Sequence, residues 1–319
     1  MELKKVLLIG GGGFVGGWIA NRLSERGIRV TIPARHRDNA KDPILLPTVY
    51  VVNADVNEPA QLAALMKGVD AVINLAGILH DGDSSQPYGK RFSAAHVDLP
   101  KKIVVAMKQT GVRRLLHMSA LKAAVDAPSA YLRSKAAGEA AVLAAANELD
   151  VTVFRPSVIF GPGDSFLNTF ATLLRLLPLL PLAGASARFQ PVYVGDVADA
   201  FATSLTDPAT FGQTYELCGP QVYTLRELVR YTGELIGKRR PVLDLPDALA
   251  ALQASVLGLL PKPPMSRDNL RSMQVDNVTD GRRNYPGWQP HPLEAIAPGY
   301  LAAIALKQRL DGYRCRAGR

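Results

Sequence analysis

The sequence predicts an α/β fold built on a doubly wound parallel sheet, and three observations indicate this class. Short apolar runs alternate with helical patterns from Val6 to Phe154. A glycine-rich turn at 10–16 joins the first apolar run to the first helical pattern. The run 71–77 is almost entirely apolar, as in a strand buried on both faces of a parallel sheet. Such alternation favours right-handed crossovers, with helices on both faces of the sheet.

The first turn carries a specific signal for function. The run 6–9 is too short for a helix, and Trp18, Ile19 and Leu23 follow the glycines at helical spacing. Glycines in a strand-to-helix turn permit a tight bend and a close approach to phosphates, and the helix N-terminus offers unpaired amides to an anion. A plain flexible turn is the alternative. We expect a dinucleotide pyrophosphate to bind, as in a Rossmann-type sheet, at Gly10, Gly12, Gly13, Phe14, Val15 and Gly16.

The other elements of the sheet follow in chain order. Further strands are predicted at 29–33, 49–53, 71–77, 115–119 and 151–154, and further helices at 58–67, 98–110 and 134–148. Residues 80–93 lack periodicity and contain Gly, Ser and Pro, so we expect a loop. It follows the fourth strand, near the carboxyl edge where such sheets bind ligands. It either closes over a substrate or is only a surface connection.

Beyond Gly161 the pattern changes to apolar stretches interrupted by proline. We predict a strand at 190–194, a helix from Asp196, a strand at 213–217 and a helix over 224–236. Thr224 and Glu227 form a capping box for that last helix. We therefore expect a nucleotide-binding domain at 1–160 and a smaller C-terminal substrate region at 161–319, with 190–219 returning to the core sheet.

The composition is that of a compact globular protein. The 319 residues are 48% hydrophobic and 20% charged, and no repeat or low-complexity tract is evident. Only four apolar residues precede the glycines, too few for a signal-peptide core, so we expect a cytoplasmic protein. Cys218 and Cys315 lie far apart without ligand spacing, which favours neither a disulfide framework nor a zinc site.

The net charge of +9 is uneven, because ten Lys or Arg against five Asp or Glu follow from Lys262 onward. A basic surface fits nucleic acid, an anionic membrane or an anionic substrate, but no nucleic-acid-binding pattern accompanies it, so we expect no such partner. A solvated tail ending at 314–319 is the alternative. The apolar stretch 245–260 is too short to span a bilayer. It either lies on a membrane surface, at its inner face, or packs as a core or lid helix.

Tyr131 and Lys135 are the strongest catalytic candidates. Four residues apart, they share one face of a helix. A cation beside a phenol favours the ionised form and brings its pKa, ordinarily about 10, closer to neutral pH, where the phenol can exchange a proton with a carbonyl or hydroxyl. An exposed Tyr and Lys on a surface helix is the alternative. Their place after the fifth strand, a short loop from Ser119, favours catalysis.

With these motifs in order, the chain resembles the short-chain dehydrogenase/reductase superfamily, in its extended or atypical branch of NAD-dependent epimerases and dehydratases. The resemblance rests on the glycine pattern, the Asp55-Val56 pair, the strand end 74–77, Tyr131 with Lys135, and the run 155–164. It implies further cofactor contacts at Asp55, Val56, Leu75, Ala76, Gly77, Lys135, Pro156 and Val158.

A narrower resemblance is to the nucleotide-binding accessory subunits of respiratory complex I and their bacterial relatives. Residues 190–198, the proline-rich apolar stretch before them and residues 273–278 carry it. Those relatives bind NADPH, and many have no established reaction. The resemblance therefore implies cofactor binding more firmly than turnover.

The serine of the expected catalytic triad departs from the superfamily pattern. In extended members it lies at or just beyond the end of the fifth strand, so either Ser119 or Ala120 takes this position. Without the hydroxyl, Tyr131 loses a partner that orients the substrate oxygen, and the rate should fall well before binding does.

The residues after the second strand favour NADP(H) over NAD(H). An acidic residue there would accept the ribose hydroxyls of NAD, whereas this chain has Ala34, Arg35, His36 and Arg37. The guanidinium groups of Arg35 and Arg37 match a 2′-phosphate in charge and in their forked donors. Two solvated arginines with NAD still bound are the alternative.

We therefore predict an NADP(H)-binding oxidoreductase acting on a hydroxyl or carbonyl of an apolar substrate. Tyr131 would be the acid/base, Lys135 would tune its pKa and Ser119 would bind the oxygen. The alternative is a redox-silent accessory or assembly protein of a membrane respiratory complex. No metal is expected, and four histidines without ligand spacing are predicted to be structural or surface residues: His80, His96, His117 and His291.

Overall fold

The computed structural model describes residues 3–36, 43–82, 87–246, 248–249, 253 and 265–302. The chain forms two compact units. Unit 1 comprises 1–156, 194–217 and 280–287, and unit 2 comprises 157–193, 218–279 and 288–319.

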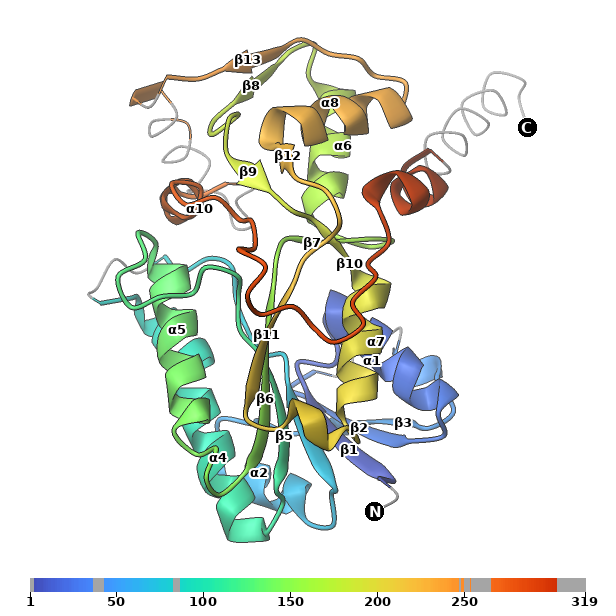
Figure 1. The fold of residues 1–319 in the computed structure, drawn as a ribbon, viewed down its shortest axis with the longest axis vertical. Helices are drawn as coiled ribbons and strands as arrows, with labels where there is room; N and C mark the ends of the chain where they lie inside the picture. Colours follow the sequence, from blue (N-terminus) through green and yellow to red (C-terminus); the bar gives the residue numbers. More distant parts are fainter. Residues whose placement is uncertain are drawn as a thin grey trace. The chain divides into compact units, whose positions relative to one another are not determined.

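A seven-stranded parallel sheet forms the centre of unit 1 (Figure 1). Its strands are β1 (Lys5–Ile9), β2 (Arg29–Ala34), β3 (Val49–Asn53), β4 (Ala71–Asn74), β5 (Arg114–Met118), β6 (Asp150–Pro156) and β11 (Gln213–Leu217). Their spatial order is β11-β6-β5-β4-β1-β2-β3, and every pair is parallel. The order reverses between β1 and β4, the point at which doubly wound sheets bind ligands. The predicted fold class is confirmed.

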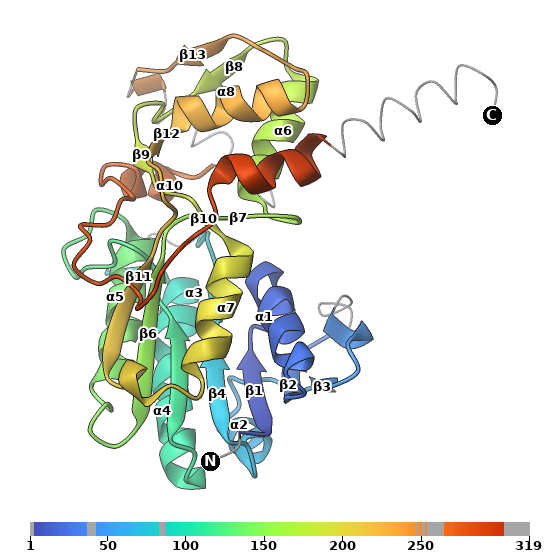
Figure 2. The same cartoon turned by 45° about the vertical axis from the view of Figure 1, so that its right-hand side comes forward.

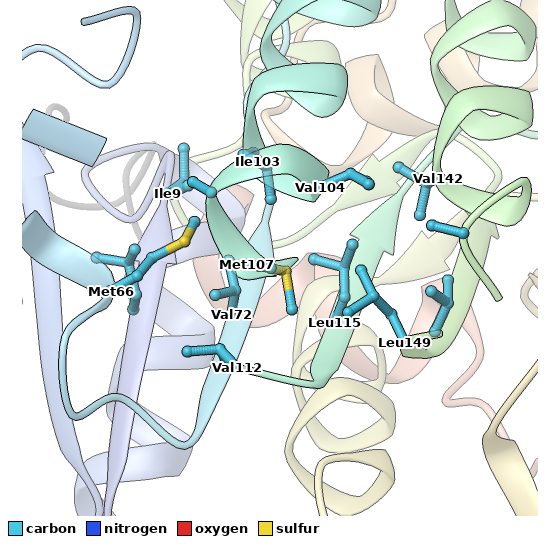
Figure 3. Close-up of a cluster of buried hydrophobic side chains, with 14 of the residues drawn as sticks. Ile9, Met66, Val72, Ile103, Val104, Met107, Val112, Leu115, Val142 and Leu149 are labelled. Atoms are coloured by element: carbon cyan, nitrogen blue, oxygen red, sulfur yellow. The ribbon is translucent and has the colours of Figure 1, made fainter. Parts of the chain in front are cut away.

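Helices cover both faces of this sheet (Figures 1 and 2). One face carries α1 (Phe14–Glu25) and α7 (Val194–Ser204), which pack together. The other carries α2 (Pro59–Met66), α4 (Leu99–Thr110) and α5 (Ala130–Leu143). Short turns of helix occur at η2 (Pro43–Leu45) and η4 (Pro208–Thr210). A buried apolar cluster joins the second helix layer to the strands, and Figure 3 shows side chains such as Met66, Ile103, Met107, Leu115 and Val142 within it.

The helix predicted at 98–110 begins earlier than expected, so the predicted loop 80–93 ends sooner. It starts as α3 (Lys90–Phe92) and passes through a wide π-helical segment, η3 (Ser93–Asp98), into α4. Pro100 accounts for the widening, because it has no N–H to donate to the carbonyl of His96 four residues earlier. That carbonyl lies against α5 where Gly138 leaves room, since a Cβ there would collide with it. Residues 83–86 of the predicted loop lie outside the described residues.

Unit 2 consists of short strand pairs and helices around its own apolar cluster. The pairs are β7 (Ile159–Phe160) with β10 (Val192–Tyr193), β8 (Leu180–Leu182) with β13 (Val242–Asp244), and β9 (Arg188–Phe189) with β12 (Tyr223–Thr224). The helices are α6 (Phe166–Leu176), α8 (Leu225–Leu235), α10 (Arg267–Ser272) and the helical residues 293–302. The predicted capping box of Thr224 and Glu227 is present at the start of α8.

Several predicted features of the C-terminal half fall on residues that the structure does not describe. These are most of the apolar stretch 245–260, Cys315 and the basic residues 314–319. Cys218 is described, and it is buried. Among the helices that are described, none has the length and apolar character needed to cross a bilayer.

Candidate functional site

The glycine turn lies at the carboxyl end of β1, beside β4. The backbone of Gly10 is left-handed, with φ of 82°, and a Cβ there would lie 3.0 Å from backbone atoms of Leu75 and Ala76. Only glycine allows this bend and this close approach. Gly13 is the N-cap of α1, and no side chain of the described residues caps that helix. The first amides of α1 are therefore available to an anion, as the sequence predicts.

The predicted adenine-side residues follow β2 and β3 at the same edge of the sheet. Arg35 is exposed just beyond β2, whereas Arg37 lies outside the described residues. Asp55 follows β3, and its Oδ1 accepts hydrogen bonds from the backbone N–H and the Nδ2 of Asn57, each at 2.9 Å. The backbone hydrogen bond from Asn57 is the main cause that holds the pKa of Asp55 below its usual value, and the charge of Arg35 adds to it. Val56 packs on the core cluster of unit 1.

Helix α5 begins at Ala130, four residues earlier than predicted, and therefore contains Tyr131 in its first turn. Ser129 is the N-cap, and its hydroxyl accepts a hydrogen bond from the backbone N–H of Leu132 at 3.2 Å. Tyr131 and Lys135 are consequently one turn apart on the same face of the helix.

Lys135 connects α5 to the ends of β4 and β5. Its side chain is buried, with only 4% of the residue exposed, and its Nζ donates to the carbonyl of Met118 at 2.9 Å. A Cβ at Gly77 would lie 3.4 Å from the same Nζ. Burial lowers the pKa of Lys135 to about 8, and the carboxylate of Glu139 opposes that shift. The structure thus brings together two residues, Lys135 and Gly77, that were predicted separately.

Tyr131 is half-buried beside two rings. Its ring centroid lies 6.1 Å from that of Phe92 and 5.6 Å from that of His96. Burial raises the pKa of Tyr131 to about 12. The expectation that Lys135 brings this pKa toward neutral pH is wrong for this structure, because desolvation of the phenolate dominates and the ammonium donates to Met118 instead. The phenol therefore keeps its proton at neutral pH.

His96 joins the turn after β4 to the first turn of α5. Its Nε2 accepts from the backbone N–H of Ile78 at 3.0 Å, and its Nδ1 lies 2.8 Å from the Oγ of Ser134. The Ser134 hydroxyl in turn donates to the carbonyl of Tyr131 at 2.8 Å. Because Nε2 accepts, we assign the proton of the neutral imidazole to Nδ1. Burial first, then the charge of Lys135, lowers the pKa of His96 to about 2.

His96, predicted from the sequence to be a structural or surface residue, lies next to Tyr131, a position that the prediction did not foresee. A signal was present in its spacing from Pro100, which frees the His96 carbonyl and widens the helix. Widened turns of this kind often accompany functional sites.

Two buried polar atoms close to the end of β5 have no hydrogen-bond partner in the described parts of the chain: the Oγ of Ser119 and the Nε2 of His117. The Nδ1 of His117 lies 3.1 Å from the Nδ2 of Asn74, whose Oδ1 accepts from the N–H of Ala76. The Asn74 amide therefore donates to Nδ1, and the ring proton of His117 is on Nε2. Burial first, and then the charge of Lys135, lowers the pKa of His117 to about 3.

Unpaired buried polar atoms in a native protein call for an explanation, and a ligand is one. The glycine turn and these two atoms lie along the same carboxyl edge of the sheet, after β1 and at the end of β5. These residues fit a dinucleotide: the glycine turn would hold its phosphates, and the unpaired atoms of Ser119 and His117 would offer it hydrogen bonds. The choice between Ser119 and Ala120 as the triad position stays a prediction.

The remaining predicted contacts are Pro156 and Val158. Pro156 ends β6 in unit 1, and its carbonyl accepts from the N–H of Leu121 at 3.0 Å. Val158 belongs to unit 2, where its N–H donates to the Oδ1 of Asn277 at 3.1 Å. Their role in holding a cofactor stays a prediction. Within the described ranges, no group of three or more His, Cys, Asp or Glu residues is placed to hold a metal ion.

A parallel sheet with such a glycine turn defines an α/β protein of the dinucleotide-binding class. Residues 6–218 match the NAD dependent epimerase/dehydratase family, and the chain belongs to this family. The description of the family names NAD, which agrees with the dinucleotide expected at the glycine turn.

The chain is similar in sequence to known proteins and in fold to solved structures, of which two relatives and one structure are examples. The chain is 32% identical to NADH dehydrogenase [ubiquinone] 1 alpha subcomplex subunit 9, mitochondrial, of Arabidopsis thaliana, over 96% of this chain and 78% of the relative. It is 28% identical to ceramide reductase of Caulobacter vibrioides, over 76% and 74% respectively. The Bordetella bronchiseptica enzyme WbmF in complex with NAD+ has a TM-score of 0.65 at 21% identity, over 76% of this chain and 81% of that one. This last likeness shows the fold alone.

Proposed function

We propose that this chain is an NADP(H)-dependent oxidoreductase that acts on the carbonyl or hydroxyl of an apolar substrate. The position of Lys135 carries the proposal. Its buried Nζ is held at the end of β5 and close to Gly77 after β4, with Tyr131 one turn earlier on the same helix. A buried cation at this edge of the sheet can bind the ribose of a cofactor, and a nearby phenol can exchange a proton with a substrate oxygen.

The state of Tyr131 favours reduction of a carbonyl. A bound nicotinamide supplies or accepts the hydride. Because burial raises its pKa to about 12, Tyr131 holds a proton at neutral pH that it can donate to the oxygen as negative charge develops there. The unpartnered hydroxyl of Ser119 is available to orient the same oxygen.

Replacement of Tyr131 by Phe tests this role. Tyr131→Phe removes the proton and should lower kcat by about 10²-fold or more, with the Kd for NADPH nearly unchanged. Lys135→Met should weaken cofactor binding as well, so the two variants separate proton transfer from binding. Equal turnover in Tyr131→Phe and the wild type would remove Tyr131 from the mechanism.

The preference for NADP(H) rests on Arg35, which is exposed just beyond β2 and whose charge reaches Asp55. Arg35→Glu should weaken NADPH binding by about 10-fold or more, because charge-assisted hydrogen bonds to a 2′-phosphate contribute about 1.5–3 kcal/mol. NADH binding should stay the same or become stronger, because an acidic residue at this place accepts the ribose hydroxyls of NAD. Arg113→Glu, at an exposed arginine before β5, is the matched control. Equal weakening of both nucleotides in Arg35→Glu would contradict the preference.

The apolar character of the substrate rests on the apolar C-terminal half and on the relative named ceramide reductase. The test is NADPH oxidation with a panel of ketones matched in the reacting group and graded in chain length. The expected result is a kcat/KM that rises with chain length. A flat profile, or a preference for nucleotide sugars, would contradict it.

The complex I relatives favour a second candidate, a redox-silent accessory or assembly protein of a membrane respiratory complex. In that case the nucleotide acts as a structural ligand and stabilises the fold by several kcal/mol at saturation. Copurification with a membrane complex, together with nucleotide binding and no NADPH consumption on any ketone, would decide for this candidate.

A further inference from the structure

Unit 2 exposes a run of apolar residues at the end of α6. Leu176, Leu177, Pro178 and Leu179 are consecutive and all exposed, Leu176 to 74% and Leu179 to 41%. Single exposed leucines are common on soluble proteins, but four consecutive exposed apolar residues indicate an interaction surface.

The strand pair β8–β13 extends this surface. Leu180 and Leu182 of β8 are buried in the core cluster of unit 2, so Pro181 between them faces the opposite side of the ribbon. Leu243 of β13 is the register partner of Pro181 and is 52% exposed. Figures 1 and 2 show β8 and β13 side by side, with α8 below the ribbon. Leu243 therefore lies on the side of the ribbon away from the core, and Leu176 to Leu179 lead directly into β8.

A basic run borders these leucines. Lys238 and Arg239 are exposed and Arg240 is half-buried, and the three residues precede Pro241 and β13. The N–H of Leu180 donates to the carbonyl of Pro241 at 2.9 Å, and the Nε of Arg240 donates to the carbonyl of Leu174 at 3.5 Å. These contacts hold the cations beside the end of α6.

The charge of this region is positive even after its carboxylates are counted. Asp244 pairs with Arg226, and Glu234 lies 3.6 Å from Arg239. Glu227, next to Arg226 at the start of α8, is exposed as well. Against these three carboxylates stand five basic side chains: Arg175, Arg226, Lys238, Arg239 and Arg240. Aliphatic side chains bordered by an excess of cations complement a surface that has an anionic outer layer and an apolar layer beneath it.

We propose that the leucine–arginine face, defined by 176–179, Leu243 and 238–240, docks on the surface of an anionic phospholipid bilayer. The leucines enter the boundary between head groups and acyl chains, and the cations bind the head-group phosphates. Protein interfaces are enriched in aromatic residues, and the residues that define this face include none. The proposal is independent of the oxidoreductase chemistry.

Vesicle binding of the full chain tests the proposal. Sedimentation with phosphatidylcholine vesicles, with and without phosphatidylglycerol, should show binding only to the anionic vesicles. Lys238→Glu with Arg239→Glu should weaken the partition coefficient by about tenfold or more. Leu176→Ser with Leu179→Ser should weaken it by a similar factor. Val125→Ser, at a valine of unit 1 that is 82% exposed, is the matched control and should bind as the wild type does.

The outcomes separate lipid docking from its alternatives. Because the substituted side chains are exposed, the thermal midpoint and NADPH affinity should be unchanged, which rules out misfolding as the cause of lost binding. If Lys238→Glu with Arg239→Glu loses vesicle binding but Leu176→Ser with Leu179→Ser keeps it, the proposal is overturned in favour of simple electrostatic attraction. Absence of vesicle binding would overturn it as well, and a leucine variant that converts an oligomer to a monomer would assign the face to a second copy of the chain.

Discussion

Strand β5 has a buried cation at each end, and the two ends differ in how completely their polar groups are paired. At the amino end, Arg114 donates to the carbonyls of Asp150, Ser204 and Leu205 and to the Oγ1 of Thr210. At the carboxyl end, Lys135 donates to Met118, while the Oγ of Ser119 and the Nε2 of His117 have no partner among the described residues.

The difference separates a structural centre from the candidate functional site. A buried cation surrounded by acceptors ties distant segments together, and in unit 1 Arg114 joins β5 and β6 to the end of α7. A buried cation beside unpaired polar atoms lowers the stability of the protein alone and offers hydrogen bonds to a ligand. The second kind lies at the carboxyl edge of the sheet, where this fold class binds its cofactor.

The largest effect is expected at the amino end. Arg114→Met leaves four buried acceptors without their donor and should lower the free energy of unfolding by about 3–5 kcal/mol, measured by urea denaturation. The neighbouring Arg113 has an exposed side chain, whose Nε lies 3.5 Å from the Oδ2 of Asp150. Arg113→Met should therefore change the free energy of unfolding by less than about 1 kcal/mol. Similar losses in both variants would show that burial and pairing do not distinguish these arginines.

The next effect is acid sensitivity at the carboxyl end. His96 and His117 stay neutral in the folded protein, with pKa values of about 2 and about 3, but protonate near pH 6.5 when unfolded. The unfolded state therefore binds more protons below pH 6.5, and stability should fall as the pH falls, by up to about 1.4 kcal/mol per pH unit for each imidazole. His117→Gln should flatten this slope between pH 6.5 and 4. An unchanged slope would mean that His117 is solvated.

Lys135 should produce a smaller effect of the same kind in alkali. Its folded pKa of about 8 lies below the ordinary value of 10.5, so the unfolded state holds more protons between these values. The free energy of unfolding should therefore rise with pH from about 8 to 10, by at most about 1.4 kcal/mol per unit, relative to Lys135→Met. Tyr131 has the opposite effect on the free energy of unfolding, but only above pH 10, because its pKa is raised in the folded state. If the difference in free energy of unfolding between the wild type and Lys135→Met does not change with pH, the Lys135 ammonium is solvated in the folded protein.

The smallest expected effect is the change in stability when either of two buried serines is replaced by alanine. Ser119→Ala should not lower the free energy of unfolding and should raise it by about 1 kcal/mol, because a buried hydroxyl without a partner is desolvated and gains no hydrogen bond in return. Ser134→Ala should lower stability by about 1–3 kcal/mol, since it removes a hydroxyl that bridges His96 and the carbonyl of Tyr131. If turnover is found, Ser119→Ala should lower it more than its stability change explains. A large destabilisation by Ser119→Ala would mean that its hydroxyl is paired.

Sequence reasoning predicted the features that depend on neighbours in the chain. The strands at 49–53 and 213–217 match β3 and β11, and the capping box at Thr224 is present. The glycine turn at the end of β1 follows from a local pattern of apolar residues and glycines. Errors arose where a local signal was weak: the Ser129 cap places the start of α5 at Ala130, and Pro100 widens the helix before it rather than ending it.

The amino-acid sequence by itself determined the α/β class, the glycine-rich turn after the first strand and the spacing of Tyr131 and Lys135, because periodicity and turn chemistry act within a few residues. Only the tertiary structure decided that Lys135 lies beside Gly77, that His96 joins two elements and that the phenol of Tyr131 keeps its proton. These properties depend on desolvation and on partners from distant segments, and both exist only once the strands and helices have packed.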